Sequence, residues 1–341
     1  VLSQGLQQPA AALVTEPTAE ALVQRARDDG RLTALLHNNL GVAYTMAGQA
    51  ETGVTHFERT IALLEGGPGA PDPLLAVTHH NIGNMYVFDG RPEKARAPFM
   101  AAQQLFVKIV GEHHPQVAWP LNGLGDVALK AGDYAEAERS YAAALALREA
   151  AFGADSTHLA EVLVGLARVY ARTGRSAEAT ASFRRALALA DRPGANDPNL
   201  ADALAGLAEL TTEPAEARAL FERATAVFEA VYGKHTGRQA EAAVRAGETA
   251  GALGDHAGAI GWYERVLALP ADANAEARAA AVLGLARELA GKPGATARVC
   301  DLLAEARLSL PAQGSLRDEA EALRSSRCAS SPSPGRAGDG R

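Results

Sequence analysis

The sequence predicts an all-α fold, a right-handed α-solenoid of about seven helical hairpins stacked side by side. Three observations indicate this fold. A short pattern recurs at intervals near 42 residues along most of the chain. The composition is rich in alanine and leucine, which favour helices, and only 5% of the residues are aromatic. Long runs of β-branched residues, which would favour strands, are absent.

The repeat is marked by a Gly or Ala that follows an apolar or small residue in the first helix of each hairpin. The markers lie 42 residues apart at first, then 41 and 39, at Gly41, Gly83, Gly125, Ala167, Ala208 and Gly247. A seventh marker is either Gly284 or Ala286. Neither helix of such a hairpin can bury its apolar face alone, so neighbouring hairpins must stack.

Each marker stands in similar surroundings. A glycine seven residues later ends the first helix, because a left-handed residue at that point needs no Cβ. The second helix then carries a small residue and, four residues further on, an aromatic ring that fills the space above it. The predicted corners are Gly48, Gly90, Gly132, Gly174 and Gly254. The predicted rings are Phe57, Phe99, Tyr141, Phe183, Phe221 and Tyr263.

Some copies depart from this pattern. The fifth copy has a shortened corner at residues 211–214, without the glycine. In the seventh copy Cys300 or a neighbour takes the place of the ring. Pro98 falls inside a predicted second helix, where it removes a hydrogen bond and should kink the helix. Pro120 should do the same in the third first helix, or else delay its start.

The two ends of the chain lack the repeat pattern. Residues 1–30 are expected to form an N-terminal segment with a capping helix at 18–28, and residues 31–310 to form the repeat array. Residues 311–327 carry a charged amphipathic helix, expected over 315–327, that is suited to cap the other end. Residues 328–341 are rich in Ser, Pro, Gly and Arg and are predicted to be disordered.

These residues resemble the tetratricopeptide repeat family over roughly residues 31–310. The 42-residue period is longer than the usual period of about 34. Together with the connector at 111–118, it is similar to repeats of the kinesin-light-chain type. The resemblance implies right-handed superhelical stacking, with a concave groove lined by the first helices.

Composition and motifs argue against several other functions. The net charge is −7 and no dense basic run occurs, so nucleic acid is not expected as a partner. No stretch is long and apolar enough for a membrane span, and no signal peptide is evident, so a cytoplasmic location is expected. The two cysteines suggest no disulfide framework, which fits a reducing compartment. Nucleotide-binding, kinase, zinc-protease and paired-carboxylate motifs are missing, so no enzyme activity, cofactor or metal site is expected.

The groove is where function is expected to lie. Each first helix is numbered from the alanine seven residues before its marker, as at Ala34 and Ala76. At 100° per residue, positions 4, 7, 8 and 11 face the partner helix, and positions 2, 5, 6, 9 and 13 point away from it. The candidate peptide-binding residues are Asn38, Asn39, His80, Asn81, Asn84, Phe88, Trp119, Asn122, Asp126 and Arg168.

Two interpretations of the asparagines remain open at this point. Asn amides donate and accept hydrogen bonds, so they suit the backbone of an extended peptide. The family resemblance implies this role for Asn39 and Asn81. Alternatively, the asparagines bond to neighbouring first helices and stiffen the array.

The sequence therefore predicts a non-enzymatic interaction module that binds a peptide or protein segment. The alternative is a regulatory or sensory region of a larger bacterial signalling protein. That alternative rests on the start at Val1, and on the similarity of the repeats to arrays found behind bacterial Ser/Thr kinase domains. The excess of Arg over Lys is also typical of proteins from GC-rich bacterial genomes.

Overall fold

The computed structural model describes residues 13–26, 30–65, 71–192, 197–232, 237–269, 275–290, 292–309 and 315–328. Within these ranges the chain is an all-α solenoid, and no strand occurs in them. It divides into two compact units, Val1–Leu189 and Ala190–Arg341, which are described separately. None of the helices described is long and apolar enough to cross a membrane.

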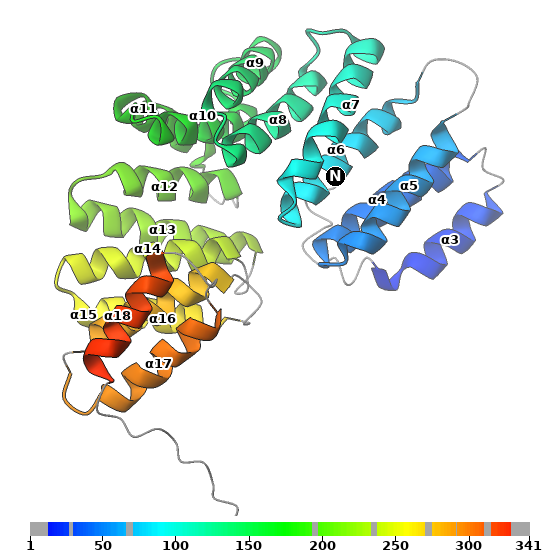
Figure 1. The fold of residues 1–341 in the computed structure, drawn as a ribbon. Coiled ribbons are helices and arrows are strands. Elements are labelled where there is room, and N and C mark those ends of the chain that lie inside the picture. Colours follow the sequence, from blue (N-terminus) through cyan, green and yellow to red (C-terminus); the bar gives the residue numbers. More distant parts are fainter. Residues whose placement is uncertain are drawn as a thin grey trace, which may run out of the picture. The chain divides into compact units, whose positions relative to one another are not determined.

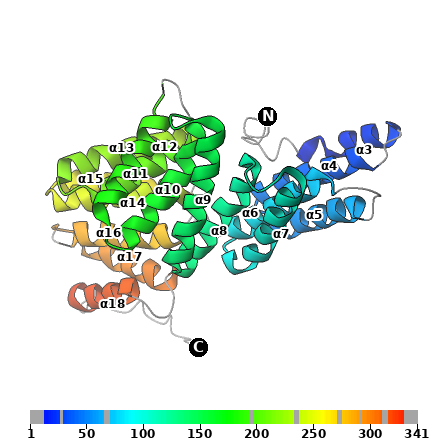
Figure 2. The ribbon, with the colours of Figure 1, turned by 90° about the horizontal axis from the view of Figure 1, so that it is seen from above.

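Unit 1 is a succession of antiparallel helix pairs preceded by one short helix (Figures 1 and 2). The short helix α3 (Glu16–Arg25) contacts α4, and α4, α6 and α8 each pack on the second helix that follows them. The pairs are α4 (Arg31–Met46) with α5 (Ala50–Leu64), α6 (Pro73–Phe88) with α7 (Pro92–Val110), α8 (Ala118–Ala131) with α9 (Tyr134–Phe152), and α10 (Ala160–Arg172) with α11 (Ser176–Ala190). Short 3₁₀ turns, η1 (Pro115–Val117) and η2 (Thr157–Leu159), lead into α8 and α10.

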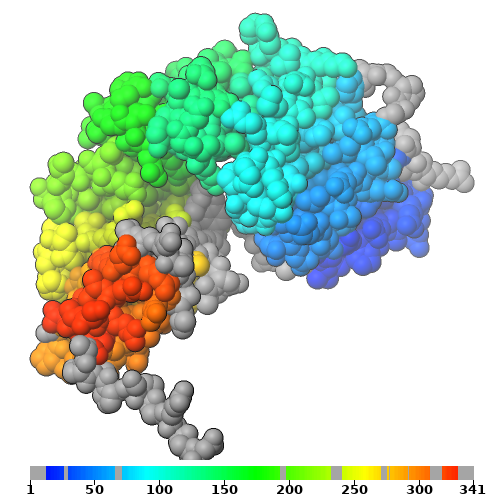
Figure 3. Space-filling model, in the orientation of Figure 1, coloured from blue at the N-terminus to red at the C-terminus, as the bar shows by residue number. Residues whose placement is uncertain are grey.

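Unit 2 continues the same arrangement and ends in a single helix. Its pairs are α12 (Pro198–Leu210) with α13 (Pro214–Tyr232), α14 (Gly237–Ala252) with α15 (His256–Leu267), and α16 (Ala275–Leu289) with α17 (Thr296–Ser309). The final helix, α18 (Ser315–Arg327), spans the residues that the sequence predicts for it and packs on α16 and α17. It lies on the surface of this unit beside α17, and is red in Figure 3.

The predicted glycine corners are confirmed. Gly48, Gly90, Gly132, Gly174 and Gly254 all have φ between 74° and 78°, the left-handed region that a residue with a Cβ rarely adopts. The fifth copy instead turns between Leu210 and Pro214 without a glycine, as its shortened sequence indicates.

The aromatic ring of the second helix is buried in the first six hairpins, and in several of them it lies between two glycines. Tyr141 is fully buried; a Cβ added at Gly125 in its own hairpin would lie 2.7 Å from the ring, and one at Gly165 in the next hairpin 2.5 Å. Phe99 lies in the same way against Gly83 and Gly123. The ring therefore belongs to the packing of two successive hairpins.

This arrangement settles the register of the seventh copy. A Cβ on Gly284 would lie 2.4 Å from Tyr263, the ring of the preceding hairpin, so Gly284 corresponds to Gly123 and the marker is Ala286. The corner is then Gly294, at φ 78°. Nine residues beyond it, where the other copies carry a ring, the fully buried Leu303 occupies the site. The residue in place of the ring is thus Leu303 and not Cys300.

The two prolines behave differently from each other. Helix α7 is continuous across Pro98, so this proline does not end the helix. Helix α8 begins at Ala118, which puts Pro120 in its first turn. The N–H groups of a first turn have no partner within the helix, so Pro120 removes no helical hydrogen bond there.

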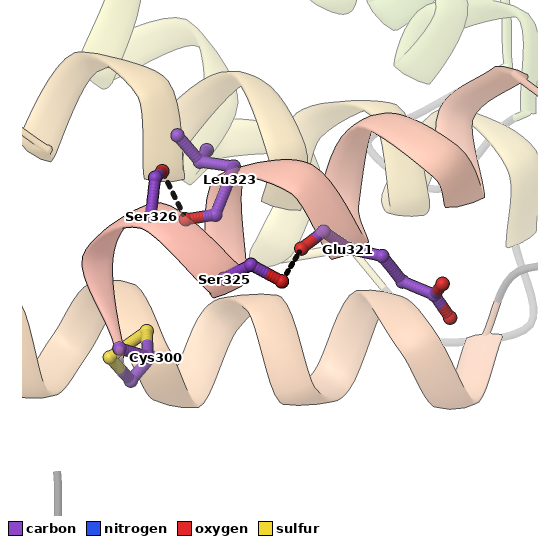
Figure 4. Close-up of a disulfide and its surroundings, with 6 residues drawn as sticks. Cys300, Glu321, Leu323, Ser325 and Ser326 are labelled. Atoms are coloured by element: carbon purple, nitrogen blue, oxygen red, sulfur yellow. Dashed lines mark hydrogen bonds between the residues drawn. A yellow bond between two sulfur atoms is a disulfide. The ribbon is translucent and has the colours of Figure 1, made fainter. Parts of the chain in front are cut away.

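The expectation of unpaired cysteines is wrong. Cys300 on α17 and Cys328 at the end of α18 form a disulfide, with 5.8 Å between their Cα atoms (Figure 4). Folding α18 back on α17 brings together two residues that are 28 apart in the sequence. The inference of a reducing compartment therefore loses its basis. Cys328 also does not belong to a disordered tail, and residues 329–341 lie outside the described residues.

Candidate functional site

The first helices of unit 1 are packed on three sides, and this determines which of their side chains stay exposed. Positions 2 and 13 keep side chains at the surface, for example Leu35, Phe88 and Trp119. Positions 5 and 6 point instead toward neighbouring hairpins, as Gly123 and Gly165 show by their contacts with rings of the preceding hairpins. Position 6 of α8 and α10 is thus covered by a neighbouring hairpin, which a projection of one hairpin alone does not include, whereas Asn39 and Asn81 at position 6 of α4 and α6 are half-buried.

Asn38, at position 5 of α4, is buried between two successive first helices. Its side-chain oxygen accepts hydrogen bonds from Thr78 Oγ1 at 3.2 Å and from Asn81 Nδ2 at 3.0 Å, both on α6. Asn38 is only 1% exposed. These contacts match the alternative in which asparagines join neighbouring first helices, and the sequence analysis did not single out Thr78 as part of the network.

Asn122 holds the same position on α8 but is not paired in the same way. It is 6% exposed, and its Oδ1 finds no hydrogen-bond partner among the described residues. The next helix, α10, places Val162 and Gly165 where α6 offers Thr78 and Asn81 to Asn38. Neither of these side chains can donate a hydrogen bond, so the Asn122 oxygen is left unsatisfied.

His80 is the corresponding residue of α6. Its Nε2 lies 3.0 Å from Asn84 Nδ2. Because an amide nitrogen only donates, Nε2 accepts and the ring proton is on Nδ1. That Nδ1 is buried without a partner in the described part of the chain, since α8 supplies Pro120 and Gly123 at the facing positions. Burial, with a smaller effect from the positive charge of Arg148, lowers the pKa of His80 from 6.5 to about 4.

The ring of His80 belongs to an aromatic cluster that is mostly buried and reaches the surface at Trp119. Its centroid lies 5.6 Å from that of Phe99 and 6.2 Å from that of Trp119. Trp119 also packs edge-on against Phe106, with the centroids 5.7 Å apart. The cluster holds the Trp119 indole in place while 38% of this residue remains exposed.

The remaining candidates occupy intermediate or exposed positions. Asp126 accepts a hydrogen bond of 2.6 Å from Tyr141 Oη, and burial raises the pKa of that tyrosine. Arg168 is half-buried on α10, and Asn84 is exposed on α6. Asn39 is half-buried, and its Oδ1 has no partner among the residues that the structure describes.

Large apolar side chains are exposed on three successive first helices. Leu35 and Met46 on α4, Phe88 on α6 and Trp119 on α8 are between 38% and 67% exposed. We call these four residues with Asn84 the first-helix surface. None of the five is charged, although the exposed Lys130 holds position 13 of α8; on α10 both corresponding positions are charged, with Glu161 and Arg172. An uncharged, partly apolar surface of this kind is suited to binding another protein segment.

Hairpins that share rings with their neighbours define a helical-repeat scaffold. The sequence model of the tetratricopeptide repeat family matches residues 32–106, 74–150, 116–192 and 198–272. These matches cover well over half of the chain, so the chain belongs to the tetratricopeptide repeat family. The chain is a protein-interaction scaffold whose repeats recur at intervals near 42 residues.

Several solved structures have a similar fold. BtubC (BKLC) from P. vanneervenii is 22% identical with a TM-score of 0.54, over 67% of this chain and 92% of that one. The apo form of RapI is 15% identical with a TM-score of 0.59, over 80% of this chain and 92% of its own. A putative kinesin light chain from Podosopora anserina, with nearly identical TPR-like repeats, is 18% identical with a TM-score of 0.46, over 60% and 98% of the two chains. The first two likenesses show the fold. No curated protein matches this chain.

Proposed function

We propose that this chain binds an extended peptide or protein segment along the first-helix surface of unit 1. The observation that carries the proposal is the exposure of Leu35, Met46, Phe88 and Trp119 on three consecutive first helices. Rigidly held aromatic side chains are frequent anchors of protein interfaces, because they bury a large area at little cost in conformational entropy. The apolar side chains of a ligand would pack on Trp119 and Phe88.

The polar contacts of the ligand would come from the asparagines. Asn84 is the exposed one among the candidate asparagines, so its amide is the first that an incoming backbone would meet. Asn39 and Asn122 would contribute if their side chains rotated outward, and each has an oxygen that such a contact would satisfy. Asp126 and Arg168 would place charged groups beyond this neutral stretch.

We propose that this binding role is non-enzymatic, and that the chain is part of a cytoplasmic bacterial protein. The tetratricopeptide family supports the first part, since its repeats serve as binding modules. The preference for Arg over Lys supports the bacterial origin. In a reducing cytoplasm a disulfide such as Cys300–Cys328 is typically transient and redox-sensing.

A peptide-display library selected on the whole chain tests the binding surface. The two tryptophans are Trp119 and Trp262, so a Trp262→Phe protein reports from Trp119 alone. Selected peptides are expected to shift its fluorescence. Phe88→Ala is expected to lower affinity at least about tenfold, as for a truncated interface anchor.

Met100→Ala is the matched control. Met100 is 43% exposed on the second helix α7, so it lies off the first-helix surface. Its substitution should leave the affinity unchanged. If the peptides lose affinity with Met100→Ala and not with Phe88→Ala, they bind the second helices and the proposal fails.

A further inference from the structure

Helix α18 buries little apolar surface. Ala320, at 2% exposure, is its one buried apolar residue among those described, and Leu323 is only partly buried. Its ion pairs to α16 and α17, Arg287 with Glu319 and Arg307 with Glu321, join side chains that are each more than 40% exposed. Exposed pairs of this kind contribute little to stability. The disulfide to Cys300 is therefore the strongest tie that holds α18 on α17.

A hollow of about 380 Å³ that is open to the surface lies beside this disulfide. It is lined by Arg307, Glu321, Arg324, Ser325 and Cys328. Ser325 Oγ donates to the backbone oxygen of Glu321, as Figure 4 shows. Cys328 thus faces a polar opening with two arginines and one carboxylate. A net positive surrounding attracts small anions and stabilises a thiolate.

We propose that Cys300–Cys328 is a reversible thiol–disulfide site, that a small anionic thiol reaches it through this hollow, and that its reduction releases α18. The thiolate of the small thiol attacks Cys328 Sγ, and the S–S bond breaks to release the Cys300 thiolate. A second thiolate attacks the sulfur of the small thiol in the mixed disulfide and releases the Cys328 thiolate. Two small thiols become one disulfide, two electrons pass to the protein, and its two thiolates take up protons.

Release of α18 changes the end of unit 2. Ala320 and Leu323 pack on the apolar cluster that contains Leu303 and Ala306 of α17. Without α18 this cluster becomes the outer face of the last hairpin, and terminal repeats need a polar outer cover. Reduction therefore converts a covered end of the array into an apolar one.

The experiment treats the oxidised full chain with glutathione, without denaturant. N-ethylmaleimide labelling and intact mass are expected to show two new thiols. Hydrogen exchange in α18 is expected to become at least about tenfold faster, because local unfolding then costs less. Exchange in α12 and α13 should stay the same. Thiols that form only in urea, or unchanged exchange in α18 after reduction, would overturn the proposal.

Two variants separate the parts of the proposal. In Cys300→Ser, combined with Cys328→Ser, α18 should exchange rapidly with or without glutathione. Arg324→Ala should slow reduction by glutathione about threefold relative to the neutral thiol 2-mercaptoethanol, since it removes one attracting charge. Arg298→Ala, on the same helix α17 but paired with Glu264 and absent from the hollow, should leave that ratio unchanged. Equal effects of the two arginine variants would refute access through the hollow.

Discussion

Replacing Asn38 with alanine should destabilise unit 1, and the structure allows the loss to be worked out. The substitution removes an acceptor that is 1% exposed and receives two hydrogen bonds, from Thr78 and Asn81. Thr78 Oγ1 keeps its other contact, 2.7 Å from the backbone oxygen of Leu74, and Asn81 is only half-buried. Thr78 shares its one hydroxyl proton with Leu74, so the loss is one full bond from Asn81 and a partial one from Thr78. At about 0.5–1.5 kcal/mol for a hydrogen bond, the free energy of unfolding should fall by about 1–2 kcal/mol.

Asn122→Ala is the matched comparison, because it changes the same side chain at the same position of α8. The Asn122 oxygen has no partner in the described part of the chain, so the substitution breaks no hydrogen bond to it. It also removes a buried acceptor that costs free energy while it is unsatisfied. The free energy of unfolding should therefore fall by at least about 1 kcal/mol less than it does for Asn38→Ala.

Urea unfolding of both variants in the Trp262→Phe background measures the difference. Trp119 is then the sole tryptophan, and its fluorescence follows the unfolding of unit 1. The slopes of the transitions should match, so that a shift in midpoint reports stability. If the two variants lose the same stability, the bonded and unbonded asparagines are equivalent and the reasoning from their partners is wrong.

Three further predictions follow from the packing and from the buried histidine. Gly165→Ala should cost about 1–3 kcal/mol by overpacking, because its Cβ would meet the Tyr141 ring at 2.5 Å, and urea midpoints check it. Ala137→Leu, at a fully buried site, should cost a similar amount and reduce exchange protection first near α8 and α9, whereas uniform loss along unit 1 would contradict it. His80 has a pKa of about 4 when folded and 6.5 as its ordinary value, so below pH 6.5 the unfolded chain binds the additional proton and stability falls as pH drops. Between about pH 7.5 and pH 5 the free energy of unfolding should therefore fall by about 2 kcal/mol. The variant His80→Gln should lack that part of the pH dependence of stability.

The repeats could be predicted from the sequence because each depends on contacts that are local or one repeat apart. Glycine corners such as Gly48 need a left-handed residue, and buried rings such as Tyr141 need a small residue on the facing helix. Both requirements leave a mark at fixed spacing. The seventh copy lacks the ring, so its register became clear only from the contact between Gly284 and Tyr263.

The candidate site was harder to predict. The orientation of Asn38 depends on what the next first helix presents, and the same position is satisfied at Asn38 but not at Asn122. A single-helix projection contains no information on that neighbour. The disulfide was missed for a related reason: two cysteines give no spacing pattern, and only the return of α18 onto α17 brings them together.

The ring that lies between two glycines has a consequence for how such an array can change its length. Tyr141 is enclosed by Gly125 of its own hairpin and Gly165 of the next. Truncation of the array between those two hairpins would therefore expose one face of the ring. A deletion of one complete period would instead bring position 6 of another first helix against the same ring, and the contact is kept where that residue is a glycine, as Gly123 is for Phe99. Duplication and loss in steps of one period thus preserve such contacts between glycine-bearing hairpins, whereas an insertion shorter than a period would break them unless it falls in a connector between hairpins.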